Sequence, residues 1–181
     1  PVQERTTQLK AANHQLTLEI EKHTQPEYDL GRREAIIEAV HVGAVKFLQK
    51  GPNESIVREA LAGLGNAVEA SRVYVYKKNT SKNGAILTSQ LCKWLAPGTD
   101  LPANSPDLDY LGRQTGLIER WVQRMKLGHT VVEHVGDFPL PERQALASLG
   151  ICSIILVPIF VENKWWGFIG FDDCRRERSW S

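Results

Sequence analysis

The chain has 181 residues, which is enough for one domain with a hydrophobic core and an appendage. A hydrophobic content of 42%, a charged content of 24% and a net charge of +1 are ordinary for a soluble globular protein and exclude a general attraction to nucleic acid or anionic membrane. No apolar run approaches the roughly 20 residues that span a bilayer, and no signal peptide is recognisable. Because the chain opens at Pro1 rather than at a Met, we expect a fragment of a longer cytoplasmic protein.

The cysteines are Cys92, Cys152 and Cys174, and they form no CxxC pair. An odd number without that spacing supports neither a zinc site nor thioredoxin-like redox chemistry. We therefore expect reduced thiols, as is usual in the cytosol.

Residues 1–24 are polar, with apolar side chains seven positions apart at Val2, Leu9 and Leu16. This heptad spacing places Asn13 at a core position, where an Asn fixes the register of a two-stranded coiled coil. The segment is therefore expected to be a signalling helix or coiled-coil linker that supports a parallel homodimer. A solvated helix or linker is the alternative interpretation.

Two amphipathic helices are expected next. The capping-box pattern Thr24-Gln25-Pro26-Glu27, with Pro in the first turn, predicts a new helix there, and Lys50-Gly51-Pro52 ends it. A second helix is expected to begin at about Asn53. Each helix has one apolar face, so both need a common apolar surface, which a sheet supplies.

The middle of the chain reads as short strands, loops and helices. Asn83-Gly84 predicts a hairpin turn, and residues 97–109, with several Pro and small polar residues, predict a long loop. The expected strands span 72–78, 86–95 and 130–135, and the expected helices span 117–125 and 141–149.

The stretch 150–174, GICSIILVPIFVENKWWGFIGFDDC, organises the rest of the chain. Its two apolar runs flank the polar break Glu162-Asn163-Lys164, which is a β-hairpin pattern. Both arms are apolar on both sides, as in strands that are covered on both faces. We therefore expect this hairpin at the centre of a sheet with material packed above and below it.

This order of elements resembles a GAF domain of a bacterial signalling protein over residues 33–181. The most specific matching parts are Ser-Ile-Ile-Leu-Val-Pro-Ile, Trp-Gly-Phe-Ile-Gly-Phe and the Arg-Ser-Trp-Ser tail. The resemblance implies an α+β fold with an antiparallel sheet of five to six strands, dimerising helices on one face and the roof of a ligand pocket on the other. Residues 1–24 are then the linker, and 25–181 are a GAF domain that lacks its C-terminal helix.

The function implied by the resemblance is sensory and not enzymatic. Such a domain binds a small molecule, here an unknown one, and transmits occupancy through dimeric helices to a covalently linked output module, as in sensor histidine kinases and cyclic-dinucleotide enzymes. A structural dimerisation module without a ligand is the alternative. A third interpretation is a GAF-type reductase of free methionine sulfoxide built on Cys152 and Asp172.

Side-chain alternation selects the candidate pocket residues. If Cys152 faces the roof, so do the residues two and four positions on, and a matching set lies on the partner strand. A Trp from the helix expected over the sheet and an Asp that matches one in pigment-binding relatives complete the set. The candidates are Trp121, Asp137, Cys152, Ile154, Leu156, Trp166, Phe168 and Asp172.

The sequence matches the ligand-binding residues of known family members only in part. Bilin-binding relatives have a pocket His at the position of Asp172 and a Cys-His pair in the helix written PERQALASLG here, and the absence of both argues against a covalent bilin. Asn163-Lys164 imitates a cyclic-nucleotide signature in the wrong place and is interpreted as a hairpin turn. His129 and His134 have the wrong spacing for a helical metal pair, so no metal site is expected.

A run of mixed charge follows the hairpin. Arg175, Arg176 and Arg178 lie among acidic residues, and the mixed sign argues against a phosphate-binding track. We expect a solvated turn there.

Overall fold

The structure is a computed structural model that describes residues 2–51, 53–80, 86–99 and 116–180. The chain consists of two compact units, Pro1–Glu38 and Ala39–Ser181. Within the described ranges, no helix is both long enough and apolar enough to cross a membrane.

The first unit is helical and belongs to helix α1, which runs from Val2 to Lys50. The expected start of a new helix at Thr24 is wrong, because the helix continues through Pro26 without a break. An interior Pro removes one backbone hydrogen bond, but the surrounding residues are rich in Glu, Lys, Gln and Leu, which favour the helix. The pairing of residues 1–24 in a coiled coil, and their assignment as a separate linker, stay predictions.

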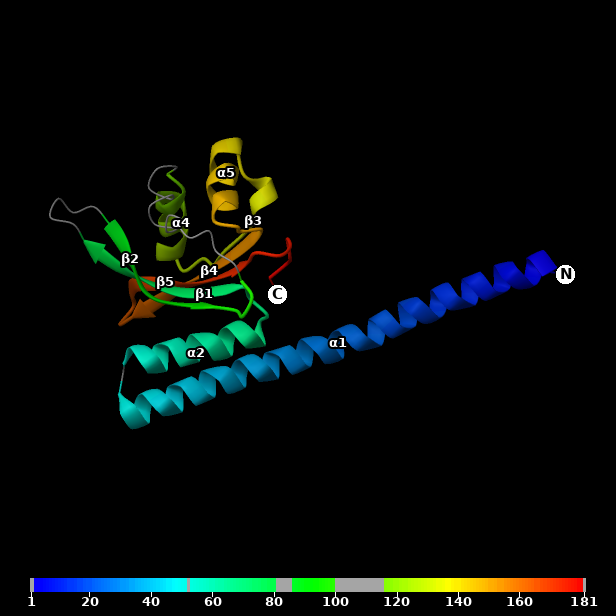
Figure 1. The fold of residues 1–181 in the computed structure, drawn as a ribbon, viewed down its shortest axis with the longest axis horizontal. Coiled ribbons are helices and arrows are strands. Elements are labelled where there is room, and N and C mark those ends of the chain that lie inside the picture. Colours follow the sequence, from blue (N-terminus) through cyan, green and yellow to red (C-terminus); the bar gives the residue numbers. More distant parts are fainter. Residues whose placement is uncertain (1, 52, 81–85, 100–115, 181) are drawn as a thin grey trace. The chain divides into compact units, whose positions relative to one another are not determined.

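The second unit is built on a five-stranded antiparallel sheet with the order β2-β1-β5-β4-β3 (Figure 1). The strands are β1 Arg72–Thr80, β2 Ile86–Leu95, β3 Val131–His134, β4 Ser153–Val161 and β5 Lys164–Asp173. The expected central hairpin is confirmed, since β5 is the middle strand and β4 is its neighbour. Its turn residues Glu162 and Asn163 have φ of 50° and 61°, the left-handed backbone of a tight two-residue hairpin loop.

One face of the sheet packs helix α2, Glu54–Ala67, which contacts β1 and β2. The helix begins at Asn53, whose side-chain oxygen accepts a hydrogen bond from the backbone N–H of Ile56 at 3.0 Å. The last turns of α1 lie beside α2: a Cβ added to Gly43 would be 3.2 Å from that of Ala60. The α2-side core comprises the buried residues Leu61, Ala70, Val73 and Cys92, with partly buried Val57, Val68, Val75, Trp94, Ile169, Phe171 and Trp180.

The opposite face carries α4, Leu117–Lys126, the short 3-10 helix η1, Val135–Asp137, and α5, Leu140–Ser148 (Figure 1). The expected helices at 117–125 and 141–149 are thereby confirmed. Asn83-Gly84 and most of the expected loop at 97–109 lie outside the described residues. Helices therefore cover both faces of the sheet, and the roof-side core lies under α4 and α5. That core consists of Tyr74, Tyr76, Leu117, Ile118, Trp121, Val122, Met125, Val131, Val135, Phe138, Leu146, Leu149, Ile151, Ile154, Leu156, Trp165 and Phe168.

Substitutions of two glycines of α2 test how closely this helix packs against the sheet. A Cβ at Gly65 would overlap the ring of Trp94 in β2, whereas a Cβ at Gly63 would lie 3.4 Å from that of Ala39, an ordinary contact. We expect Gly65→Ala to lower the free energy of unfolding by about 1–3 kcal/mol through overpacking. Gly63→Ala should leave it unchanged or raise it by up to about 1 kcal/mol, because Ala favours helix. Urea unfolding of both variants measures the difference, and equal effects would contradict the close approach of α2 to Trp94.

Candidate functional site

Four of the expected pocket residues meet in the roof-side core. Trp121 reaches it from α4, Ile154 and Leu156 from β4, and Phe168 from β5. Each of them is fully buried. Phe168 stacks on Tyr76 with ring centroids 5.2 Å apart and planes 5° apart. The middle of the roof-side face is thus filled by the domain's own side chains.

Asp172 lies on the same face but is part of a buried ion pair. Its Oδ2 accepts a hydrogen bond of 2.8 Å from Nε of Arg72, and its Oδ1 accepts one of 2.8 Å from the Tyr74 hydroxyl. Arg72 also donates to the carbonyl oxygen of Leu149 at 3.0 Å, where α5 ends. The exposed fractions of Asp172 and Arg72 are 1% and 6%. The Tyr74 ring crosses over Gly170, where a Cβ would overlap it, and this lets its hydroxyl reach the carboxylate.

The charges of this network depend on one another. Burial raises the pKa of the Asp172 carboxyl, and the Arg72 charge and the hydrogen bonds from Tyr74 and Arg72 offset part of that rise. Burial alone would lower the pKa of Arg72, but the Asp172 charge, helped by weaker neighbouring contributions, raises it overall. Burial and the Asp172 charge raise the pKa of Tyr74 well above its ordinary value, so its hydroxyl stays a hydrogen-bond donor. Asp172 is therefore engaged with the fold itself.

Trp166 lies elsewhere than side-chain alternation predicts. A bulge between Ile159 and Phe160 shifts the β4–β5 register, so that Phe160 pairs with Trp165. One extra residue reverses the alternation beyond the bulge. Trp165 consequently joins the roof-side core with Phe168, and Trp166 does not. The half-buried Trp166 instead has the Lys77 ammonium 6.0 Å from its ring centroid.

Cys152 is half-buried and lies just before β4. Its backbone N–H donates to the Asp173 carbonyl oxygen at 2.8 Å. Burial raises the pKa of the Cys152 thiol, and the charges of Asp173 and Glu177 raise it further. The thiolate that a nucleophilic cysteine needs is therefore disfavoured here.

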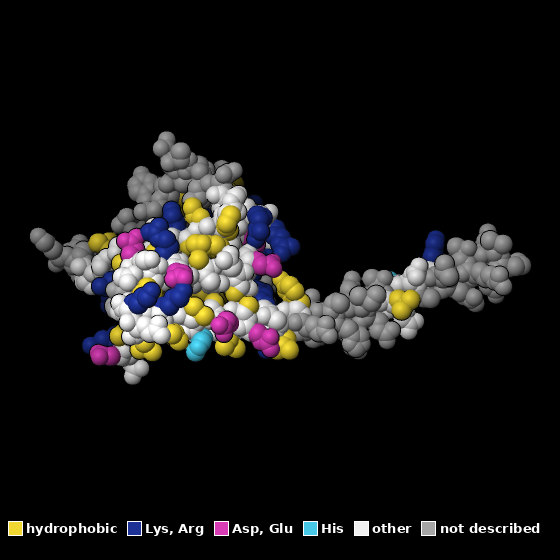
Figure 2. Space-filling view, turned by 60° about the horizontal axis from the view of Figure 1, so that its bottom comes forward, with side chains coloured by type: hydrophobic (Ala, Val, Ile, Leu, Met, Phe, Trp, Pro, Cys, Tyr) yellow, Lys and Arg dark blue, Asp and Glu magenta, His cyan; other side chains and the backbone are white. Residues whose placement is uncertain are grey.

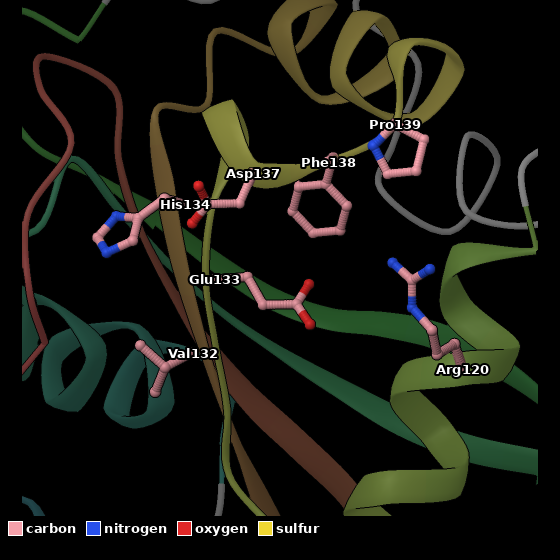
Figure 3. A pocket seen from close by; sticks show the side chains of 7 residues that line it. All are labelled: Arg120, Val132, Glu133, His134, Asp137, Phe138 and Pro139. Carbon is pink, nitrogen blue, oxygen red and sulfur yellow. The ribbon is translucent and has the colours of Figure 1, made fainter.

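A cavity of about 290 Å³ lies at the β3 edge of the sheet. Helix α4, strand β3 and η1 with the residues after it form its walls. Asp137 is the one expected pocket residue among those that line it. The lining consists of Arg120, Val132, Glu133, His134, Asp137, Phe138 and Pro139. Figure 3 shows the Phe138 ring, the Glu133 carboxylate and the Arg120 guanidinium around a common space, with Asp137 beside the ring.

Ion pairs hold the polar groups of this cavity in place. Glu133 accepts one hydrogen bond of 2.9 Å from the Trp121 indole N–H and one of 2.9 Å from Arg124. Arg120 donates to both oxygens of Glu142 at 3.2 and 3.1 Å. The Arg120 guanidinium also lies 5.5 Å from the Phe138 ring centroid. The cavity thus offers fixed donors and acceptors next to an aromatic surface, the usual composition of a small-molecule pocket, at the small end of the size range.

Sequence reasoning missed most of this lining. Glu133 follows Val131 by two positions on β3, so both side chains face the roof. A Glu at such an inward position was the one sequence feature that could have predicted this lining. Arg120, Phe138 and Pro139 carry no such signal, because only the fold brings α4 next to η1. No group of three His, Cys, Asp or Glu side chains suited to a metal ion occurs in the part of the chain that the structure describes.

The fold and the cavity define a class of protein: an antiparallel sheet covered by helices on both faces, with a small pocket under the helices of one face. The chain belongs to the GAF domain family, whose sequence model matches residues 52–181.

The relatives of the chain include much longer proteins. The methanogenesis regulatory histidine kinase FilI of Methanothrix harundinacea (strain 6Ac) is 37% identical over 153 residues, which are 84% of this chain and 17% of that protein. An uncharacterised protein of Azorhizobium caulinodans is 22% identical over 127 residues, 68% of this chain and again 17% of that protein. The chain therefore spans about a sixth of the length of these relatives.

Solved structures share the fold at low identity. The phycoerythrobilin-bound GAF domain of a cyanobacterial phytochrome has a TM-score of 0.58 and 14% identity, with 80% of this chain and 83% of that one covered. The biliverdin-bound far-red absorbing dark state of JSC1_58120g3 has a TM-score of 0.54 and 20% identity, with 78% and 86% covered.

The residues of this chain do not fit a bilin. Asp172, which the resemblance matches to a His of bilin-binding relatives, is buried in its ion pair with Arg72. The helix α5, LPERQALAS, has no Cys for a covalent bond. Trp121 and Phe168 fill the middle of the roof-side face, and the cavity of about 290 Å³ lies at the sheet edge instead.

The buried ion pair can be tested by removing one partner. Asp172→Ala leaves Arg72 charged and unpaired inside the protein, so we expect the free energy of unfolding to fall by about 3–5 kcal/mol. In the double variant with Arg72→Met the buried charge is gone, and much of that loss should be recovered. Chemical denaturation of Asp172→Ala, Arg72→Met and the double variant measures this difference. A double variant that is as unstable as the sum of the two single ones would contradict a direct interaction between the two residues.

Proposed function

We propose that this GAF domain is a sensory module that binds a small molecule in the cavity at the β3 edge. The observation that supports this most is the combination of fixed ionic side chains and the Phe138 ring around one hollow of about 290 Å³. The module serves a longer signalling protein with a covalently attached output module. The name of the FilI relative, a histidine kinase, supports an output of that kind. The free cysteines agree with the cytoplasmic location that we propose.

Binding acts on the protein through its conformational equilibrium. A ligand shifts an equilibrium only when its affinities for the two arrangements differ. In the proposed mechanism, the ligand contacts η1 and α4, whose side chains line the cavity, and favours one arrangement of them. The shift reaches the output module through the paired α1 helices.

The competing function is structural dimerisation without a ligand. The complete burial of Trp121 and Phe168 favours it, because a chamber over the middle of the sheet would need these side chains elsewhere. The separate cavity at the sheet edge favours the sensor. The third interpretation, a methionine sulfoxide reductase, loses support on two counts: the pKa of the Cys152 thiol is raised, and the Asp172 carboxylate is bound to Arg72.

The α1 helix offers a surface for a parallel homodimer. Leu30, Ile37 and Ala44 continue the seven-residue spacing of the N-terminal segment, and all three are exposed. Val40 and Leu48, with exposed fractions of 55% and 88%, add apolar side chains near the end of the helix. Figure 2 shows hydrophobic side chains among the charged ones over the face that α1 and α2 form in the second unit. Apolar residues at heptad spacing in an unbroken helix are the pattern of a coiled-coil seam.

A ligand screen with a matched pair of variants tests the sensor. A metabolite that binds only the native state and is present at a concentration of 100 times its Kd stabilises that state by about 2.7 kcal/mol. This stabilisation appears as a rise in Tm. Asp137→Trp adds a large ring to the cavity wall beside Phe138 and should abolish that rise. Leu140→Trp places the same ring at a nearby exposed position outside the lining and should keep it. A compound that stabilises both variants equally binds elsewhere, and a broad screen without any stabilising compound favours the structural module.

The dimer surface is tested by charge insertion at two exposed positions of α1. Ile37→Glu places a carboxylate on the heptad seam and should raise the dimer Kd at least about 10-fold, since a charge at a core position costs more than about 1.4 kcal/mol. Ala35→Glu lies two positions away, on the other side of the helix, and should leave the Kd unchanged. Sedimentation equilibrium measures both. A monomeric parent chain, or equal effects of the two variants, would count against this seam.

A further inference from the structure

The segment that follows β5 is fixed in place by a buried carboxylate. The Asp173 side chain, with 0% exposure, accepts hydrogen bonds from the backbone N–H groups of Arg175 at 2.9 Å and Arg176 at 3.3 Å. These bonds turn the chain immediately after the strand. Residues 174–180 are therefore called the exit segment, since they lead the chain away from the sheet.

Two arginines of the exit segment donate to carbonyl oxygens at the end of α2. The expected solvated turn is wrong for Arg178 alone, since the Arg175 side chain is 63% exposed. Arg178 donates to the carbonyl oxygens of Val68 at 2.7 Å and Glu69 at 3.3 Å, and Arg175 donates to that of Glu69 at 2.7 Å. The last carbonyls of a helix lack intrahelical donors, and the negative end of the helix dipole attracts a guanidinium. The Arg178 side chain is only 10% exposed and lies 4.2 Å from the Trp180 ring centroid.

The same segment also binds the wall of the cavity. The Glu177 carboxylate accepts a hydrogen bond of 3.1 Å from the backbone N–H of Gly136 in η1. The next two residues, Asp137 and Phe138, line the cavity. A Cβ at Gly136 would lie 2.7 Å from Oε1 of Glu177, and the three atoms nearest to it all belong to the Glu177 carboxyl group. The carboxylate therefore sits where any larger residue at position 136 would displace it.

We propose that Glu177 couples the cavity to the exit segment, so that a ligand against η1 changes how the chain leaves the domain. Glu177 is a positioning residue: it touches η1 and not the cavity. A shift of η1 weakens or strengthens the Gly136–Glu177 hydrogen bond, and Arg175 and Arg178 extend the effect to the end of α2. Coupling between two sites is reciprocal, so a change in the exit segment must also alter η1. The biological meaning of this inference rests on the proposed sensory function.

Amide hydrogen exchange tests the coupling in both directions without a ligand. Glu177→Ala should speed exchange of the Phe138 amide, whose hydrogen bond goes to the Val135 carbonyl oxygen of η1 and not to Glu177. Gly136→Ala should speed exchange of the Arg175 and Arg176 amides, which bond to Asp173. We expect about 5-fold effects, the lower end for coupled sites. The double variant should exchange no faster than the single ones at these amides, because each substitution breaks the same Gly136–Glu177 hydrogen bond.

Two further variants control this experiment. Arg176→Ala removes a neighbouring exposed side chain of the exit segment and should leave the Phe138 amide unchanged. Glu177→Gln keeps an acceptor oxygen and should retain part of the protection. The inference is overturned if each substitution affects only its own segment, or if the effects of Gly136→Ala and Glu177→Ala add. These two results would overturn the coupling but not the proposed ligand binding, which the thermal-shift screen tests. Conversely, a screen that finds no ligand would not change the coupling that hydrogen exchange measures.

Discussion

Two adjacent buried carboxylates at the end of β5 constrain the rest of the domain. Asp172 and Asp173 have exposed fractions of 1% and 0%, and strand alternation turns them to opposite faces of the sheet. Asp172 binds Arg72 of β1, which in turn binds the end of α5. Asp173 fixes the turn after β5, and Arg178 of the exit segment donates to the Val68 carbonyl oxygen at the end of α2. A buried carboxylate is costly without partners, so the ends of β1, α2, α5 and the exit segment must all lie where these two groups require them.

Among the described residues, this constraint also separates the filled core from the cavity. The Asp172 network and the stacked rings of Tyr76 and Phe168 occupy the roof-side face near the middle of the sheet. The hollow lies instead at the β3 edge, where η1 follows the strand directly. Trp121 joins the two regions, since its ring belongs to the core and its N–H binds Glu133 at the cavity. Core packing therefore fixes the orientation of a cavity side chain.

The sequence was most informative where one physical rule acts locally. Two strand arms that are apolar on both sides, joined by Glu162-Asn163-Lys164, predict the central hairpin, and the amphipathic helices predict its covering. The errors arise where distant residues decide. The partner of Asp172 is 100 positions away, and the bulge that moves Trp166 depends on the β4–β5 register. The cavity joins Arg120 with Phe138, which no spacing predicts. Thr24-Gln25-Pro26-Glu27 shows the converse, a good local capping pattern that a longer run of helix-forming residues overrides.

For the sensor that we propose, the electrostatics of the cavity restrict which molecules it would select. Glu133 and Arg120 are already paired with Arg124 and Glu142, so their charges need no counter-charge from a ligand. A strongly ionic molecule would have to compete with these pairs and lose its hydration as well. Selectivity then rests on hydrogen-bond geometry, on the apolar face of Phe138 and on size. Phe138 directly follows η1, so a displacement of η1 changes the cavity wall and the contact of η1 with the exit segment together. In the proposed sensor, occupancy would therefore be transmitted through the position of η1 rather than through charge.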